Sequence, residues 1–497
     1  MVRRRRRPHD GAVDSYDVAV VGAGFGGLAA ALELTQRGAR VVLLEQLRYP
    51  GGCASTFVRG GARYESGATL FSGFGEGQLF RRWIDELGLE VQAAPMDPLV
   101  ELRAPSFSLA IPPEREVFLE RLLALPGVPS SRTRRFFREQ RRVADALWAL
   151  FDDPTLLPPF DGRSLLRHAA RAPRYLPLLR VIGVPLRDVL FRHGLLDCRP
   201  VRTFLDAVCQ ITVQCGVDEV ESPFALAAMD YYFRGTGHVH GGIGELAWAL
   251  ARAAESRGAT LRFSDRVQGI EPDGDGWRVR ARRGSLRADR VVANLTPHAL
   301  RRLRGASAPR LDRLADAVET GWGAAMLYLR LAPGALPDRA AAHHLELVAD
   351  EDAPFVRGNH VFCSVSASDE ARGREPGERT VTVSTHVPMA ELRAGDPAAM
   401  IAGIQDHMRA TLRARAPELV EATVHEMPGS PRTFERFTGR DFGYVGGIPR
   451  RVGFHHYREL TNPPIWPGLW LVGDSVFPGQ STLATALGGL QAARAAS

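Results

Sequence analysis

The chain has 497 residues, of which 45% are apolar and 24% charged, values that exclude a disordered chain. All 63 basic residues are arginines, which excludes a Schiff-base lysine and a Walker-type phosphate lysine. The five cysteines form no CxxC pair and are too few for a disulfide scaffold, so a reducing compartment is expected. The length allows two or three domains.

The net charge of +7 is unevenly distributed along the chain. Residues 1–13 begin with a run of five arginines, and we expect them to form a disordered basic tail. Residues 131–192 hold thirteen arginines against six acids, interleaved with bulky apolar residues at helical spacing. This pattern favours a helical cap that lies on an anionic membrane surface, and a solvated cap with an ordinary apolar face is the alternative. No zinc-finger or RNP-like spacing supports a nucleic-acid partner.

The arginine run and the uncharged segment 18–32 together imitate a secretory signal. Asp14 and Asp17 interrupt that pattern, and the later uncharged segment 475–493 is too polar to span a bilayer. We therefore expect no transmembrane helix, and a cytoplasmic protein bound peripherally to the inner face of a membrane. No metal site is expected.

The first predicted element is a buried parallel strand, Tyr16–Val21, which runs into a GxGxxG loop. In this loop Gly22 permits a tight turn, Gly24 admits a pyrophosphate, and Gly27 lets the next helix pack closely on the strand. The helix, predicted over 28–36, offers its free N–H groups to the phosphates. A second strand over 40–44 ends at Glu45, which is placed to bind an unphosphorylated ribose. FAD or NAD is therefore favoured over NADP.

Features at both ends of the chain favour FAD. Gly51 and Gly52 permit another close approach of backbone to cofactor. Near the C-terminus, a strand over 468–472 runs into Gly473 and Asp474, an acid positioned to bind a polyol chain. A helix predicted over 483–495 begins just after Thr482, and its N-terminus would stabilise negative charge on a reduced flavin.

Several segments together resemble the FAD-dependent carotenoid desaturases and carotenoid isomerases, the phytoene desaturase type with retinol saturase as a relative. The resemblance covers almost the whole chain. It rests on DVAVVGAGFGGLAAALELTQRGARVVLLE (17–45), PGGCASTF (50–57), YESGAT, and segments 240–270, 288–297, 431–449 and 468–490.

The resemblance implies FAD as cofactor and a set of residues that bind it. This set is Gly22, Gly24, Phe25, Gly27, Glu45, Gly51, Gly52, Val267, Gly473, Asp474 and Thr482. Within it, Val267 would meet the adenine through its backbone. This chain departs from the family pattern at Cys53, where many relatives have arginine after the paired glycines. A positive contact to the cofactor is therefore missing here or supplied by another residue.

The expected fold is α/β: a Rossmann-type FAD-binding domain assembled from discontinuous segments, with an α+β substrate-binding domain, as in amine-oxidase and phytoene-desaturase-like flavoproteins. We expect the FAD-binding domain to comprise residues 14–95, 235–300 and 455–497. The substrate-binding domain would comprise 96–234 and 301–454, with its membrane-facing cap near 131–192. A single dinucleotide fingerprint argues against a docked NAD(P)H domain.

The resemblance implies desaturation of an acyclic carotenoid, a lipophilic polyene, by hydride transfer to flavin N5 with loss of a proton and formation of a conjugated double bond. Oxygen or a membrane quinone would then reoxidise the flavin. No strong base stands out. His238 and His240 are candidates, with a structural role as the alternative, and Phe437, Tyr444 and Pro449 line either a substrate channel or the core.

Three alternatives stay open at this point. A carotenoid cis–trans isomerase, or a retinoid or carotenoid saturase, shares the fold and the flavin. An amine or porphyrinogen oxidase is a second, although no cysteine follows Cys363 to bond a C-terminal flavin covalently. A prenyl-protein escort protein of the same fold, without redox chemistry, is the third.

Overall fold

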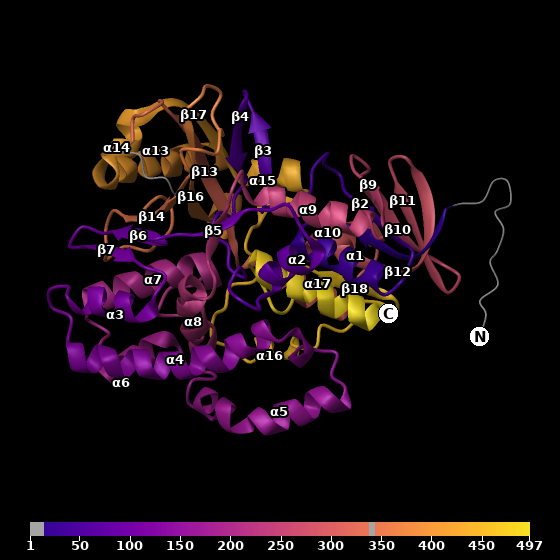
Figure 1. Cartoon of the computed structure of the whole chain (residues 1–497), viewed down its shortest axis with the longest axis horizontal. Coiled ribbons are helices and arrows are strands. Elements are labelled where there is room, and N and C mark those ends of the chain that lie inside the picture. The colour runs from indigo at the N-terminus through magenta and orange to yellow at the C-terminus, as the bar shows by residue number, and fades with distance from the viewer. Residues whose placement is uncertain (1–13, 337–342) are drawn as a thin grey trace.

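The computed structural model describes residues 14–336 and 343–497. The predicted basic tail at 1–13 lies outside the described residues. The chain forms two seven-stranded sheets, each assembled from segments far apart in the sequence (Figure 1). The predicted α/β architecture with a discontinuous Rossmann-type unit is confirmed.

The first sheet contains the predicted dinucleotide strand at its centre. Its strand order is β10-β11-β12-β1-β2-β9, and β18 pairs with β12. Neighbours β12, β1, β2 and β9 run parallel, as does β18 beside β12, so the carboxyl ends of these strands meet at one edge. The bounds are β1 Ser15–Val21, β2 Val41–Leu44, β9 Thr260–Arg262, β10 Val267–Asp273, β11 Gly276–Ala281, β12 Gly284–Asn294 and β18 Leu469–Val472.

Apolar helices cover the first sheet. Helix α1 (Phe25–Gln36) packs against both α9 (Ile243–Glu255) and α17 (Thr482–Ala496), and all three are rich in buried alanine and leucine. Helix α1 begins at Phe25, three residues before the predicted start, because the second half of the glycine loop already forms its first turn. Helices α10 (Pro297–Arg304) and α11 (Pro309–Glu319) follow β12.

The second sheet has the order β17-β13-β16-β15-β14-β6-β7. Helix α13 (Pro397–Arg415) packs on it through Ile404, Met408 and Leu412. Its strands are β6 Val100–Arg103, β7 Ser108–Ile111, β13 Trp322–Leu331, β14 His343–Val348, β15 His360–Val365, β16 Arg379–Pro388 and β17 Thr423–Gly429. We propose that each sheet forms the centre of one of the two predicted domains.

A helical layer shares a core with β6 and β7 and occupies the lower left of Figure 1. The helices that contribute to this core are α3 Arg115–Leu123, α4 Ser130–Asp152, α6 Leu186–His193, α7 Arg199–Val213 and α8 Ser222–Ala228. Helix α5, Gly162–Tyr175, contacts α4 but adds no residue to the core. Shorter elements complete the fold: hairpin β3 (Thr56–Arg59) with β4 (Ala62–Glu65), β5 (Ala93–Pro95) paired with β8 (Gly237–Val239), α2 Leu79–Leu87, α12 Met389–Ala394, α14 Pro417–Ala422, α15 Pro431–Thr438 and α16 His455–Arg458.

The arginine-rich stretch 131–192 contains most of α4, all of α5 and most of α6, and these helices have different surroundings. In α4 the bulky residues Phe136, Phe137 and Trp148 are buried in the core. In α5 the only buried residue is Ser164, whereas Leu165 and Leu166 are 56% and 73% exposed. Exposed leucines therefore accompany the arginines in α5, whereas α6 again buries Leu186, Val189 and Leu190.

Candidate functional site

A cavity of about 540 Å³ lies where the two sheets and the helical layer meet. Of the eleven residues predicted to bind the cofactor, every one except Gly27 lines it. Its wall continues from the glycine loop of β1–α1 to the ends of helices α4, α7 and α8 and to strands β13, β15 and β16. One continuous space thus joins a dinucleotide-like cradle to an apolar region.

The glycine loop leaves no room for side chains. A Cβ atom on Gly24 would lie 2.5 Å from Nδ2 of Asn294, at the end of the neighbouring strand β12. A Cβ on Gly27 would collide with the carbonyl oxygen of Gly22, so Gly27 serves the close packing of helix on strand rather than the cavity wall. The N-cap of α1, Gly24, has no side-chain cap, which leaves the first N–H groups of the helix available to phosphate oxygens.

Glu45 is held at the end of β2 by two backbone N–H groups. Ala23 N donates to its Oε2 and Leu47 N donates to its Oε1, both at 2.8 Å. Burial raises the pKa of Glu45, while these backbone hydrogen bonds oppose that rise. Glu45 lines the cavity together with Arg266 and Val267.

Asp474 lies in a charged cluster that the sequence motifs did not identify. Nη2 of Arg440 donates to its Oδ2 at 2.7 Å, and both residues line the cavity. The guanidinium of Arg440 also approaches the Cys53 thiol, whose pKa is raised by burial. An arginine from a segment far along the chain therefore places a positive charge beside Cys53. The only sequence signal was the absence of an arginine at position 53.

The start of α17 forms another part of the wall. Ser481 caps the helix, since its Oγ accepts from Ala484 N at 3.0 Å. Oγ1 of Thr482 is buried and has no hydrogen-bond partner within the described residues. The unpartnered hydroxyl, the uncapped α1 N-terminus and the glycine cradle together fit a bound flavin dinucleotide.

The far part of the cavity is mainly apolar. Its lining comes from four helical segments, one loop residue and two strands: Leu147, Trp148, Leu150, Phe151, Leu157, Ile211, Val213, Phe224, Ala227, Ala228, Tyr231, Ala324, Met326 and Phe362. Gln214 and His386 form a polar pair in this wall, with their Nε2 atoms 3.2 Å apart. Burial lowers the pKa of His386 to about 3, aided by nearby His360, so its imidazole is neutral.

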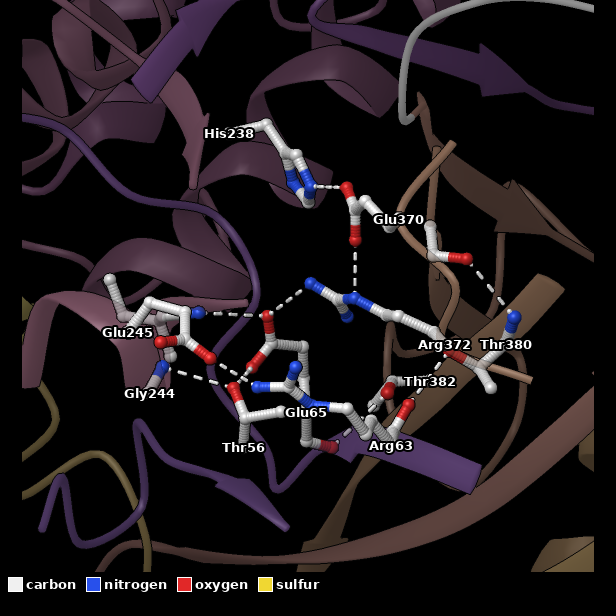
Figure 2. Close-up of polar contacts among 12 residues, drawn as sticks. Thr56, Arg63, Glu65, His238, Gly244, Glu245, Glu370, Arg372, Thr380 and Thr382 are labelled. Carbon is white, nitrogen blue, oxygen red and sulfur yellow. Dashed lines mark hydrogen bonds and ion pairs between the residues drawn. The ribbon is translucent and has the colours of Figure 1, made fainter. Parts of the chain in front are cut away.

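Neither histidine candidate lines the cavity. His238 is bonded to Glu370, which pairs with Arg372, which in turn reaches Glu65 at 3.1 Å (Figure 2). Oε1 of Glu65 also accepts from Ile243 N, at the start of α9. This buried chain of charges connects α9 and β4 to the segment before β16, so the geometry gives His238 a structural role.

The other side chains that the sequence suggested for the site also lie away from the cavity wall. His240 pairs with the exposed Asp369 at 3.5 Å. The Tyr444 hydroxyl is directed towards Arg393, Phe437 is 44% exposed, and Pro449 contacts the region of Gly321. The neighbours of these residues, Thr438, Val445 and Ile448, line the cavity instead. Of the two roles expected for these residues, the core role fits Tyr444, which is buried in the core of the second sheet.

Two kinds of feature are absent from residues 14–336 and 343–497. No helix there combines the length and the apolar character needed to cross a bilayer. No group of three or more His, Cys, Asp or Glu residues there is arranged to hold a metal ion.

The comparisons with known proteins agree with this geometry. Residues 25–496 match the family model of flavin containing amine oxidoreductases. Prolycopene isomerase 2 of an Oncidium hybrid cultivar is 26% identical over 97% of this chain and 83% of its own length. Hydroxyneurosporene desaturase of Cereibacter sphaeroides is 28% identical over 96% of this chain and 97% of its own length.

Solved structures support the fold. Wild-type putrescine oxidase bound to putrescine superposes with a TM-score of 0.65 at 15% identity, covering 97% of this chain and 98% of its own. The predicted resemblance to carotenoid desaturases and isomerases is confirmed by the relatives, and FAD is the cofactor. The chain belongs to the flavin containing amine oxidoreductase family and is an FAD-dependent oxidoreductase.

Proposed function

We propose that the protein is a desaturase of acyclic carotenoids, which removes a hydride and a proton from adjacent carbons to extend the conjugated chain. The observation that carries this proposal is the continuity of the cavity from the glycine cradle to the apolar wall of α4, α7 and α8. A hydrocarbon ligand in that wall would reach the cofactor without crossing water. The match to hydroxyneurosporene desaturase over nearly both full lengths supports it.

The protein's part in this reaction is to bind, orient and exclude water. When bound, the flavin supplies a hydride acceptor at N5. Hydride loss next to a polyene leaves a delocalised cation, which an apolar or aromatic wall such as Trp148, Phe151 and Phe362 accommodates without a strong base. We propose oxygen or a membrane quinone as the final electron acceptor.

For the cofactor, we propose that the glycine loop and the start of α1, including Phe25, hold the pyrophosphate. Glu45 would hold the adenosine ribose, and the backbone at Val267 the adenine. Gly51, Gly52 and Thr482 would face the flavin, and Gly473 with Asp474 the ribityl chain. Their common place on the wall of one cavity supports these roles.

Pigment analysis tests the reaction. Cells that make neurosporene or lycopene should accumulate products with pairs of hydrogens removed and absorption at longer wavelength when they also make this protein. Purified holoprotein in vesicles should give the same products and reduce oxygen or an added quinone. Pigments of unchanged mass in both settings would contradict desaturation.

A cis–trans isomerase is the second candidate, favoured by the prolycopene isomerases that match 97% of the chain. Poly-cis and all-trans substrates supplied in parallel separate the two. Isomerisation without a change of mass would establish the alternative. A saturase has weaker support, since human all-trans-retinol 13,14-reductase aligns with 53% of the chain.

We also propose that α5 and the turn after it dock on an anionic membrane. Leu166 and Leu179 are each 73% exposed there, and Leu176 is 61% exposed. Exposed arginines, among them Arg167 and Arg174, flank them. Basic residues around exposed leucines are the pattern of a helix lying in a lipid interface. The segment joining α4 to α5 lines the cavity, so a lipophilic substrate would enter close to this surface.

A further inference from the structure

The apolar wall of the cavity contains a buried polar group that no described residue satisfies. Among the polar residues of this wall, Tyr231 donates its hydroxyl to the carbonyl of Leu70, and Arg450 is bonded to His456 and Pro478. Oε1 of Gln214, by contrast, is buried and accepts no hydrogen bond from residues 14–336 or 343–497. A buried carbonyl without a donor costs free energy unless a ligand or water satisfies it.

The fold holds this amide in place by three independent means. Gln214 caps α7 with a left-handed backbone, φ 64°, which side-chain-bearing residues rarely adopt. Trp322 Nε1 donates to the backbone carbonyl oxygen of Gln214 at 2.9 Å, which fixes the main chain that carries the amide. A Cβ on Gly446 would collide with the amide nitrogen and lie 2.7 Å from Oε1, so position 446 leaves room for the amide only as glycine.

His386 determines how the amide is oriented. In the neutral tautomer that carries its proton on Nδ1, the imidazole of His386 accepts at Nε2 from the amide N–H of Gln214, 3.2 Å away, which leaves Oε1 as the free acceptor. An ionised carboxylate has no hydrogen to donate to Oε1. A ketone or ether oxygen lacks the hydrogen that Oε1 requires. A hydroxyl supplies that hydrogen and remains neutral.

We propose that Gln214, oriented by His386, binds a hydroxyl group carried by an otherwise hydrocarbon substrate. The hydroxyl donates to Oε1, and the apolar wall binds the hydrocarbon chain of the substrate. This subsite rests on the proposed function, since it requires a long apolar ligand in the far part of the cavity. It makes Gln214 a residue that determines specificity rather than a catalytic one.

The test compares two acyclic carotenoids that have the same chain and differ only in one hydroxyl near the end. The holoprotein in detergent micelles is titrated with each, and protein fluorescence quenching gives the dissociation constants. Wild type should bind the hydroxylated carotenoid about tenfold more tightly. Gln214→Asn, which tolerates the left-handed backbone but is too short to reach His386, should lose that preference. Gln214→Leu should lose it as well.

Gln210→Leu is the matched control. Gln210 lies one turn earlier on α7, is equally buried, and does not line this cavity. It should keep the preference. Flavin absorbance and the thermal unfolding midpoint report whether each variant folds and retains FAD.

The outcomes separate the subsite from the function. Binding of both carotenoids without preference, or an unchanged preference in both Gln214 variants, would overturn the subsite alone. Loss of flavin in the Gln214 variants would assign the amide to the cofactor and also overturn it. Failure of a folded, flavin-loaded wild type to bind either carotenoid would overturn the proposed function together with the subsite.

Discussion

The two ends of the cavity have walls of different kinds, one formed mainly by backbone and the other by side chains. At the cofactor end, the decisive positions are glycines and short loops after parallel strands, where the absence of a side chain creates the space. At the far end, bulky side chains from α4, α7, α8 and the second sheet form the wall. Backbone shape should therefore control cofactor binding, whereas side-chain identity should control what the far end accepts.

The largest effect is expected at the glycine cradle. Gly24→Val would drive its side chain into Asn294 and into the space for the pyrophosphate, so flavin occupancy should fall by more than tenfold. Absorbance of the purified protein near the flavin bands measures it. Gly403→Val in α13, which has no atom near its Cβ, is the control and should keep full occupancy. A yellow Gly24→Val protein would show that the cradle is not where the cofactor binds.

The next effect concerns the positive charge beside Cys53. Arg440→Ala removes that charge and leaves the Asp474 carboxylate without its ion pair, so FAD affinity should fall about tenfold. Adding Cys53→Arg to this variant returns a cation to the same place and should recover part of the loss. Flavin release measured by fluorescence gives both values. If the double variant binds FAD no better than Arg440→Ala, Arg440 does not stand in for the arginine that many relatives carry at the position of Cys53.

A smaller effect is expected on the surface of the cap. Leu166→Ser with Leu179→Ser should weaken sedimentation with anionic vesicles several-fold, because two exposed leucines no longer enter the lipid. Flavin occupancy should not change, since neither side chain lines the cavity. Val58→Ser, at an exposed apolar position on β3, is the control. If the double serine variant and wild type bind vesicles equally, the proposal that α5 docks on the membrane is wrong.

The smallest effect concerns the buried charge chain of His238, Glu370, Arg372 and Glu65, which lies outside the cavity wall. Burial opposes ionisation of Glu370, but the hydrogen bond from His238 and the charge of Arg372 outweigh it and lower its pKa. The stability that ionised Glu370 contributes is therefore present above its unfolded pKa and lost as the pH falls through the folded one.

Denaturant unfolding at a series of pH values tests this contribution. Wild type should exceed Glu370→Gln in unfolding free energy at neutral pH, and the two should converge below about pH 4. Glu76→Gln, at an exposed loop position, should follow wild type throughout. A constant difference between wild type and Glu370→Gln across the acid range would show that the carboxylate charge does not stabilise the fold.

Local pattern predicted the cofactor end well because its determinants lie close together in sequence. The strand, the glycine loop and the acid at the strand end occupy residues 15–45. The structure places all of them as expected, although each strand starts one residue away from its predicted start and α1 begins three residues earlier. The C-terminal strand and helix were predicted by the same reasoning, with boundaries that differ by one residue at each mismatched end. Buried parallel strands and helix starts leave signals that need no knowledge of distant residues.

The sequence by itself determined the α/β fold, the dinucleotide cradle and the family resemblance, because strand hydrophobicity and glycine spacing encode backbone geometry locally. Only the tertiary structure decided which side of a segment faces the cavity, so Thr438, Val445 and Ile448 replaced Phe437, Tyr444 and Pro449 in its wall. It also brought Arg440 to Cys53 and Gln214 to His386, and it buried the aromatic residues of α4 while exposing the leucines of α5. Such contacts join residues far apart in the chain and depend on how whole elements pack, which no local pattern records.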